Sequence, residues 1–223
     1  TDLETHKLHY ERILRIITHE IRNTITPINS LSANMLQNME KGTNMGETAM
    51  EENISVIHSQ TDNIIQFLNQ YHQLTHLPTP ARQQIQAGQL IQKIMLLLGN
   101  EPNVKFIKII VSEQMTINAD PGLLTLALIN VVRNALQTID GIEHGKIEIT
   151  VSSPNGQPFI TVTDNGPGIT PDRIEDIFMP FYSTKQHGSG IGLCLSRQIM
   201  RLHGGDLTVS SIPNQRTTFS FVF

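Results

Sequence analysis

The sequence lacks tryptophan and has a single cysteine among its 223 residues. One cysteine, Cys194, cannot form an internal disulfide, and no group of cysteines and histidines has the spacing of zinc ligands. These absences favour a reducing compartment such as the cytoplasm and argue against a disulfide-stabilised or zinc-stabilised fold. They leave Cys194 without an assigned role.

The sequence also lacks a long apolar run and an excess of basic residues. Apolar runs such as residues 94–98 fall far short of the roughly 20 residues that cross a bilayer, and no signal-peptide pattern begins the chain. The 16 basic and 20 acidic residues give a formal net charge of −4, which argues against nucleic acid as a partner. We expect a cytoplasmic protein whose membrane tether, if it has one, lies in a segment absent from this chain.

Glycine and proline are scarce in residues 1–76, which contain only Pro27, Gly42 and Gly46. Apolar residues recur every three or four positions on either side of a break at 41–46, which predicts two long helices joined by a short loop. The apolar positions are Leu14, Ile17, Ile21, Ile25, Ile28, Leu31 and Met35, then Met50, Ile54, Ile57, Thr61, Ile64, Leu68 and Tyr71.

A hairpin of two helices cannot enclose its own apolar stripe. A second copy of the chain would cover the stripe in a homodimeric four-helix bundle, since twofold symmetry is the commonest way for identical chains to associate. The alternative is that the rest of the chain covers it. Pro27 lacks the amide that would bond the carbonyl of residue 23, so we expect a bend there, which is either a functional hinge or a tolerated kink.

The segment Leu77-Pro78-Thr79-Pro80 cannot continue a helix and predicts a domain boundary. We assign residues 1–77 to the helical hairpin, 78–83 to a linker and 84–223 to a second domain. Strand-like and helical segments alternate in that domain, which predicts an α/β sandwich. The expected strands are Val104–Val111, Lys146–Val151, Phe159–Thr163, Leu207–Ser210 and Thr217–Phe223, and the expected helices cover about 88–98, 121–139 and 189–203.

Two glycine-rich segments suit a ligand that the backbone approaches closely. In residues 164–169, Asp-Asn-Gly-Pro-Gly-Ile, a carboxylate follows an expected strand and precedes two glycines, although ordinary turn chemistry explains this pattern equally well. In residues 188–193, Gly-Ser-Gly-Ile-Gly-Leu, glycines precede a helical run whose first amides suit phosphate oxygens. Neither a Rossmann fingerprint nor a Walker lysine pattern accompanies them.

Two further segments belong to the same domain. Residues 170–187 form a long polar stretch with aromatic residues at 178, 181 and 182, which is typical of a lid, or of a loop that the aromatic residues pin to the core. Asn130 and Asn134 are four apart, so they share one face of an expected helix. An amide oxygen suits Mg²⁺, although two asparagines on a helix are often only surface residues.

The order of these motifs resembles the ATP-binding domain of sensor histidine kinases. An asparagine box at 130–135 is followed by a first glycine box at 164–169, an aromatic box at 177–185 and a second glycine box at 188–193. The resemblance implies the Bergerat α/β sandwich, shared with gyrase, certain chaperones and mismatch-repair ATPases. With the hairpin, the expected fold class is α+β, and the implied ligands are ATP and Mg²⁺.

The resemblance also implies a role for each motif. Asp164 would bond the adenine amino group, Asn134 would hold Mg²⁺, and Asn130 would sit beside the metal and the phosphates. Hydrolytic relatives have a glutamate at the position of Asn130, and an amide cannot take its proton, which predicts poor hydrolysis. Thr125 and Leu126 depart from the polar pair that many relatives carry. The residues expected to face ATP are Gly166, Gly168, Lys185, Gly188, Ser189, Gly190, Ile191, Gly192 and Leu193.

Residues 19–27, His-Glu-Ile-Arg-Asn-Thr-Ile-Thr-Pro, resemble the phosphoacceptor box of the same family. His19 lies about 200° around the helix from Ile17 and Ile21, so we expect it to point away from the apolar stripe. The resemblance implies that His19 accepts a phosphoryl group from ATP with Glu20 as general base, and passes it to an aspartate in a response-regulator receiver domain. Asn23 completes a Glu-x-x-Asn pattern that implies phosphatase activity toward the same regulator.

Two other functions remain open on the sequence. One is a hydrolytic ATPase or chaperone fragment with a structural hairpin, against which Asn130 in place of an acid argues. The other is a scaffold, or a phosphatase without kinase activity, against which the two intact glycine boxes argue. The sequence identifies neither the stimulus nor the regulator, nor whether phosphorylation occurs within or between protomers.

Overall fold

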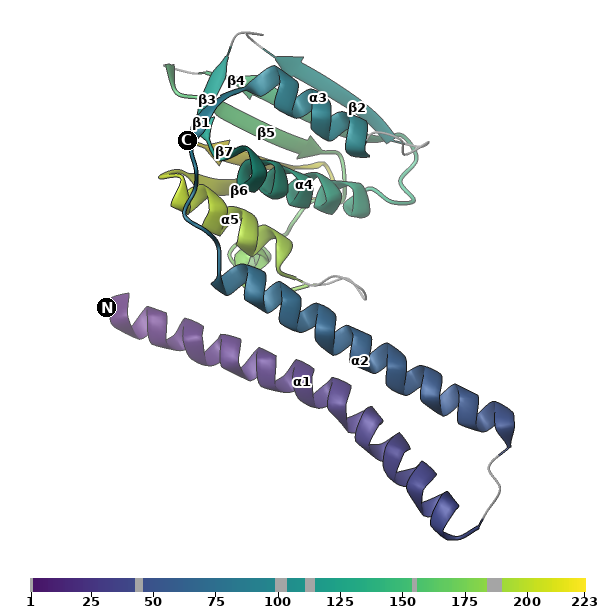
Figure 1. Cartoon of the computed structure of the whole chain (residues 1–223). Helices are drawn as coiled ribbons and strands as arrows, with labels where there is room; N and C mark the ends of the chain where they lie inside the picture. The colour runs from purple at the N-terminus through teal and green to yellow at the C-terminus, as the bar shows by residue number, and fades with distance from the viewer. Residues whose placement is uncertain (1, 43–45, 99–103, 111–114, 154–155, 184–189) are drawn as a thin grey trace. The chain divides into compact units, whose positions relative to one another are not determined.

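The structure, a computed structural model, describes residues 2–42, 46–98, 104–110, 115–153, 156–183 and 190–223. Within these ranges, the side chains of residues 2–14, 16, 20, 70, 104 and 108–110 lie outside the description. The chain divides into two units, Thr1–Thr75 and His76–Phe223, each with its own internal packing. Figure 1 labels their helices and strands.

The first unit is a hairpin of two long helices, α1 (Asp2–Glu40) and α2 (Glu47–Thr75), which pack against each other. α1 continues through Pro27, and the bend expected there stays a prediction. The chain leaves α1 at Gly42, whose φ of +63° is in the left-handed region that glycine adopts without strain. Of the apolar stripe predicted on α1, the described members other than Ile25 are half-buried: Ile17, Ile21, Ile28, Leu31 and Met35.

The apolar stripe predicted on α2 is divided between two environments. Ile57 and Ile64 are half-buried in the hairpin, because one neighbouring helix can cover only one face of α2. Other members remain exposed on the hairpin: Met50, Ile54, Leu68 and Tyr71. The hairpin therefore leaves a second apolar face uncovered.

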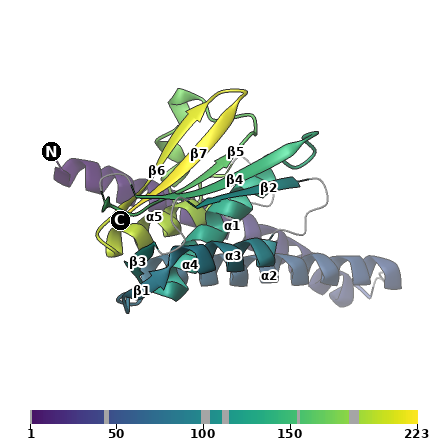
Figure 2. The same ribbon diagram turned by 90° about the horizontal axis from the view of Figure 1, so that it is seen from above.

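The second unit is a two-layer α/β sandwich. Its sheet has the strand order β2-β4-β5-β7-β6, in which β2 and β4 are parallel and the other neighbours antiparallel. The strands are β2 (Val104–Ile110), β4 (Gly145–Ser152), β5 (Phe159–Asp164), β7 (Arg216–Val222) and β6 (Asp206–Ile212). Figure 2 shows three helices on one face of this sheet: α3 (Ala87–Leu98), α4 (Pro121–Thr138) and α5 (Gly192–Leu202). The fold class expected from the sequence is confirmed.

Two short strands were missed by the sequence analysis. β1 (Gln83–Gln86) pairs with β3 (Thr116–Ala119) in an antiparallel two-stranded sheet. β1 is glutamine-rich and has one apolar residue, Ile85, so it shows no alternating pattern. The end of the segment assigned as linker, residue 83, is therefore the first residue of a strand.

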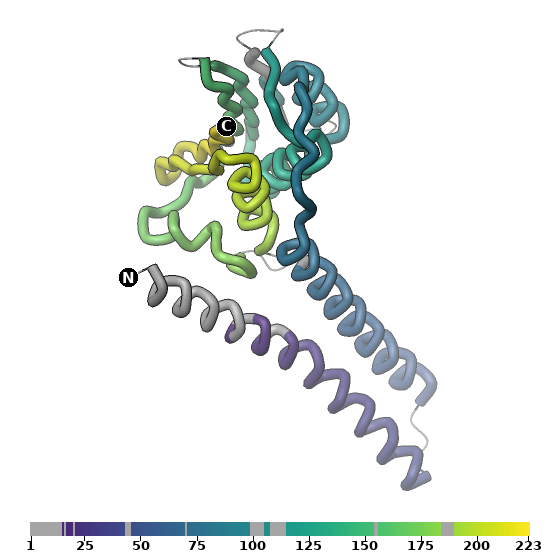
Figure 3. The backbone as a smooth tube through the Cα atoms, turned by 60° about the vertical axis from the view of Figure 1, so that its left-hand side comes forward, coloured from purple at the N-terminus to yellow at the C-terminus, as the bar shows by residue number. Residues whose placement is uncertain are grey.

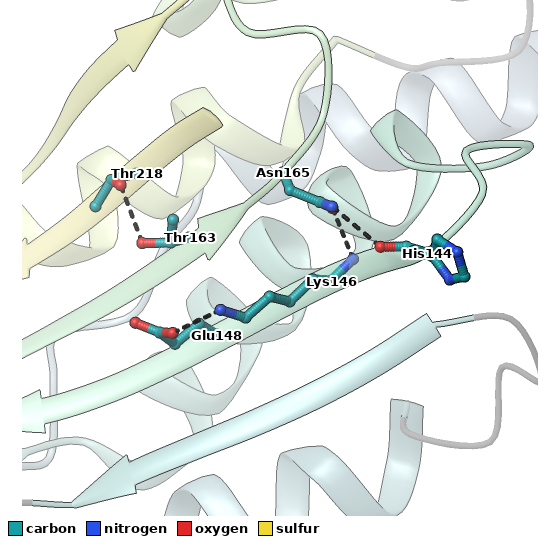
Figure 4. Close-up of polar contacts among 6 residues, drawn as sticks. All are labelled: His144, Lys146, Glu148, Thr163, Asn165 and Thr218. Carbon is teal, nitrogen blue, oxygen red and sulfur yellow. Dashed lines mark hydrogen bonds and ion pairs between the residues drawn. The ribbon is translucent and has the colours of Figure 1, made fainter. Parts of the chain in front are cut away.

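The sheet buries alternate residues against the helices, as a period of two requires. β4 and β5 bury Ile147, Ile149, Val151, Ile160 and Val162, while β7 buries Phe219 and Phe221. The opposite face carries polar pairs, shown in Figure 4: Lys146 and Glu148 form an ion pair at 3.1 Å, and Thr163 and Thr218 share a hydrogen bond at 2.9 Å.

Asp120 fixes the start of α4. Its Oδ1 accepts hydrogen bonds from the N–H groups of Gly122 and Leu123, both at 2.9 Å, and its Oδ2 accepts one from Ala81 N–H at 2.9 Å. The bond from Leu123 N–H, with those from Ala81 and Gly122, outweighs the opposing effect of burial and lowers the pKa of Asp120. Asp120 N–H donates to His203 Nε2 at 2.9 Å, which ties α4 to the end of α5.

We expect Asp120→Ala to lower the free energy of unfolding of the second unit by about 1 kcal/mol at pH 7, the typical cost of removing a helix N-cap. Because folding depresses the pKa of Asp120, its stabilisation is present above the ordinary value of 3.8 and is lost as pH falls through the folded value. Urea denaturation at pH 7 and pH 3 checks both points.

The matched control is Asp140→Ala, since Asp140 is an exposed acid just beyond the other end of α4. It should change stability by less than about 0.5 kcal/mol. Equal effects of the two substitutions, or an Asp120 effect that grows on acidification, would contradict the capping account.

Candidate functional site

Helix α4 contacts both glycine-rich segments. Near its middle, Asn130 Nδ2 donates to Gly192 O at 3.4 Å, and a Cβ on Gly192 would lie 3.6 Å from Asn130 Cβ. At its end, Thr138 Cγ2 would lie 2.8 Å from a Cβ on Gly166. α4 thus brings together three motifs that are far apart in the sequence, those of residues 130–135, 164–169 and 188–193.

Asp164 is a buried carboxylate at the end of β5, with 2% of its surface exposed. In the sheet it lies between Ile147 on β4 and Thr217 on β7. Its Oδ1 accepts a hydrogen bond from Gly166 N–H at 2.9 Å, and a Cβ on Gly166 would lie only 2.7 Å from the same oxygen. The turn after β5 therefore requires glycine at 166 in order to hold this carboxylate.

Asn165 joins the turn after β5 to the beginning of β4 (Figure 4). Its Oδ1 accepts Lys146 N–H at 2.6 Å, and its Nδ2 donates to His144 O at 3.0 Å. Its own N–H donates to Lys146 O at 3.2 Å. Because its side chain and backbone are both engaged, Asn165 positions its neighbour Asp164.

The rest of the first glycine segment packs on the turn between β6 and β7. Gly168 has a φ of +73°, and a Cβ there would lie 2.5 Å from Ile212 O. Asn214 N–H donates to Pro167 O at 2.6 Å, and Ile169 N–H donates to Ser211 Oγ at 2.8 Å. Both the backbone conformation and the lack of space require glycine at 168.

The second glycine segment leads into α5, which begins at Gly192. The residue before the helix, Ile191, has no polar side-chain atom that could cap the first turn of α5. The amides of that turn therefore need other partners, and phosphate oxygens are suitable ones. Gly190 O accepts Phe181 N–H at 3.0 Å, which joins the backbone at Phe181 to the residues just before α5. Leu193 is half-buried in the first turn of α5, whereas Lys185, Gly188 and Ser189 lie outside the described residues.

The asparagines of α4 fit a magnesium ion that is also bound to phosphate. Among the described residues, no group of three or more His, Cys, Asp or Glu could hold a metal ion. Asn130 and Asn134 are one turn apart on α4, and Asn130 uses its amide nitrogen toward Gly192 O, so its amide oxygen could face a metal ion. Mg²⁺ prefers oxygen ligands and takes several from water and phosphate, so a neutral pair of amides suits it.

His19 lies on the exposed face of α1, as the periodicity predicts. The side-chain nitrogen of Asn23, one turn later, is 2.9 Å from His19 Nδ1, so the two residues share a face and a contact. Which group donates depends on the ring tautomer and on the orientation of the amide. The side chain of Glu20 lies outside the described part of the chain, and in that part no helix combines the length and apolar composition of a membrane span.

The sequence analysis missed residues that shape this site. Thr138 closes one side of Gly166, and Thr217 is a buried cross-strand neighbour of Asp164. One signal could have found Thr217, because it is in phase with the buried Phe219 and Phe221 on β7. Asn165 carried no separate signal, since its partners are backbone atoms of β4.

Residues 119–223 match the family described as histidine kinase-, DNA gyrase B-, and HSP90-like ATPase. The matched region contains Asn130, Asp164 and both glycine segments. This part of the chain is therefore an ATPase domain of that family, and its sandwich is of the Bergerat type.

Within this ATPase family, the individual proteins to which the chain is similar are histidine kinases. The histidine-protein kinase AtoS of Escherichia coli K12 is 32% identical over 210 residues, which are 92% of this chain and 33% of AtoS. The sensor histidine kinase ZraS of Escherichia coli O157:H7 is 30% identical over 207 residues, 92% of this chain and 44% of ZraS. The catalytic domain of the histidine kinase ThkA is 29% identical with a TM-score of 0.57, covering 63% of this chain and 95% of that domain.

Over most of its length the chain is therefore similar to sensor histidine kinases, and its residues 119–223 match the ATPase family that includes their catalytic domains. It spans less than half the length of these curated relatives.

We expect Gly168→Ala to weaken ATP binding at least tenfold, because the new Cβ would collide with Ile212 O and displace the first glycine segment. The matched control is Gly141→Ala. Gly141 has a similar φ of +74° but nothing within 4 Å of a Cβ.

Both substitutions introduce about 1 kcal/mol of left-handed strain. Isothermal titration with Mg-ATP should find normal affinity for Gly141→Ala. Normal ATP affinity in Gly168→Ala would contradict the packing described for this segment.

Proposed function

We propose that the chain is the catalytic core of a protein-histidine kinase that binds Mg-ATP, phosphorylates its own His19, and transfers the phosphoryl group to an aspartate of a response regulator. The observation that carries the proposal is the convergence on α4 of a buried carboxylate, two asparagines and two glycine segments. Kinship with sensor histidine kinases supports it.

In this proposal different residues of the pocket bind the adenine, the metal ion and the phosphates. Asp164 accepts a hydrogen bond from the adenine amino group, for which a buried carboxylate at a strand end is suited. Asn134, with Asn130 beside it, supplies amide oxygens to Mg²⁺, which neutralises charge on the transferred group. Backbone amides of both glycine segments, from residues 166 and 168 and from 188–193, face phosphate oxygens together with Lys185.

Phosphoryl transfer then requires the His19 ring to attack the γ-phosphorus with a neutral nitrogen. We assign the attack to Nε2, which requires the tautomer with the proton on Nδ1 and the Asn23 amide turned so that its oxygen faces that proton. A bond forms between Nε2 and phosphorus, the bond from phosphorus to the β,γ-bridging oxygen breaks, and ADP leaves with its electron pair. Glu20 takes the ring proton. Asn130 cannot act as a base toward water, so slow ATP hydrolysis is expected.

We expect His19→Gln to abolish phosphorylation of the chain by γ-labelled ATP while ATP affinity remains within about twofold of wild type, since His19 is not part of the pocket. Acid-labile and alkali-stable label on wild type identifies phosphohistidine. Label that persists in His19→Gln, or rapid phosphate release without protein label, would favour a different acceptor or a hydrolytic ATPase.

A response regulator is the proposed partner because the proposed kinase needs an aspartate to accept the phosphoryl group from His19. ThkA has been solved in complex with the response regulator TrrA, and that ThkA structure covers 99% of this chain with a TM-score of 0.66. At 24% identity this likeness shows the fold, so the partner rests on the kinase proposal itself.

We also propose that Asn23 serves a phosphatase activity toward the phosphorylated regulator. Its amide lies beside His19 Nδ1 on an exposed face of α1, where it can orient water toward a phosphoaspartate. The Glu20-x-x-Asn23 pattern supports this assignment.

We expect Asn23→Ala to reduce phosphatase activity at least tenfold, because an alanine cannot orient the attacking water. Loss of phosphate from a phosphorylated receiver domain measures it. Asn29→Ala is the control, since Asn29 is another exposed asparagine on α1. Full activity in Asn23→Ala would refute the assignment.

Homodimerisation through the hairpin is part of the proposal. Large apolar side chains stay exposed on both helices of the hairpin, with Leu36 61% and Met39 71% exposed on α1 and Ile54 and Leu68 each 50% exposed on α2. A row of this length on one soluble hairpin indicates a surface that another protein covers. A second copy offers the same row, which suits a twofold four-helix bundle.

Sedimentation equilibrium should find twice the chain mass of 24.9 kDa at micromolar concentration. Ile54→Glu combined with Leu68→Glu should give monomers, because charged groups cannot be buried unpaired in the bundle. A monomeric wild type at about 100 μM would contradict the homodimer, since homodimer affinities are usually far tighter.

A further inference from the structure

Arg197 on α5 holds an aromatic ring and a carboxylate at the same time. Its guanidinium carbon lies 4.6 Å from the centroid of the Phe178 ring. Its Nε and Nη2 donate to the two oxygens of Asp206, at 2.9 and 3.1 Å. A planar guanidinium can satisfy both contacts at once, with its edge toward the carboxylate and its face over the ring.

Phe178 is fixed from a second direction as well. Its ring packs edge-to-face on Phe219, with centroids 6.4 Å apart and planes at 88°. Phe219 is 1% exposed and belongs to the core on β7. Phe178 thus connects the sheet core with the arginine on α5.

Phe178 ends the short 3₁₀ helix Asp176–Phe178, which lies between the two glycine boxes. Met179 N–H donates to Asp176 O at 2.8 Å, and Tyr182 N–H donates to Met179 O at 3.2 Å. Phe181 N–H donates to Gly190 O, which ties this stretch to the residues just before α5. Figure 3 shows the light-green tube of this region running beside α5, in agreement with the contact between the 3₁₀ helix and α5.

Asp206 is ionised to hold Arg197. Burial favours its neutral form, but the hydrogen bonds from Arg197 and Leu207 N–H and the charges of Arg197 and Arg201 outweigh it and lower the pKa of Asp206. Arg201 approaches the same carboxylate at 3.4 Å and is 61% exposed, against 31% for Arg197. The two arginines share Asp206, and Arg197 adds the contact with Phe178.

We propose that Arg197 is a positioning residue for ATP, which holds Phe178 and thereby fixes residues 179–182 against Gly190, next to the first turn of α5 that is proposed to face phosphate oxygens. This inference rests on the proposed kinase function. Arg197 acts through Phe178, so its loss should leave the pocket floor at Asp164 and Asn130 intact and should weaken the capture of ATP more than the chemical step.

The test compares Arg197→Ala with Arg201→Ala in the full chain. Steady-state labelling of His19 at varied Mg-ATP gives KM and kcat, and urea denaturation gives stability. We expect Arg197→Ala to raise KM for ATP about tenfold with a smaller change in kcat, and Arg201→Ala to leave both within about twofold. Arg197→Lys should restore part of the loss, because an ammonium keeps the charge but not the planar double contact.

Phe178→Leu provides a second route should Arg197→Ala fold poorly. It keeps an apolar side chain against Phe219 while removing the ring, so KM should rise as in Arg197→Ala. Adding Arg197→Ala to it should cause little further change, because both substitutions remove one interaction. An unchanged KM in the single variants, or equal shifts in Arg197→Ala and Arg201→Ala, would overturn the inference. Failure of the wild type to bind ATP would instead refute the proposed function.

Discussion

The burial of the Asp164 carboxylate at the end of β5 is the constraint on which the rest of the site depends. Removing a charge from water is costly unless hydrogen bonds compensate it. Gly166 N–H supplies one such bond, and only a residue without a Cβ lets the turn come that close to the carboxylate. Asn165 then fixes the turn to β4, and Gly168 seats it on the turn between β6 and β7.

Helix α4 also borders the site. Its hydrogen bonds to the rest of the second unit explain how motifs that are far apart in the sequence keep fixed positions. Asp120 caps its beginning and is bonded to Ala81 and to His203 at the end of α5. Farther along, Ser196 Oγ on α5 donates to Ala127 O on α4 at 3.1 Å. The two helices therefore form one packed pair. The asparagines of α4 and the first turn of α5 keep a fixed spacing, which a phosphate chain with its metal would require.

Much of this arrangement could be predicted from the sequence, because it follows from local patterns. Alternation predicted β4, β5 and β7, periodicity predicted both long helices, and motif order predicted which segments belong to the site. β1 was not predicted because it has a single apolar residue, and β3 was not predicted because its alternation extends over only four residues. The contacts of Arg197 with Phe178 and Asp206 were not predicted either, because the sequence of an amphipathic helix does not indicate which residues its charged side chains contact. The role of each site residue toward ATP stays a prediction.

The most direct measurement is the affinity of wild type and Asp164→Asn for Mg-ATP and Mg-GTP, by isothermal titration. A buried carboxylate should accept a hydrogen bond from the amino group of adenine and repel the carbonyl oxygen at the same position of guanine. The account predicts ATP affinity at least tenfold above GTP affinity in wild type, and loss of most of that preference in Asp164→Asn. Equal affinities in wild type, or an undiminished preference in Asp164→Asn, would contradict it.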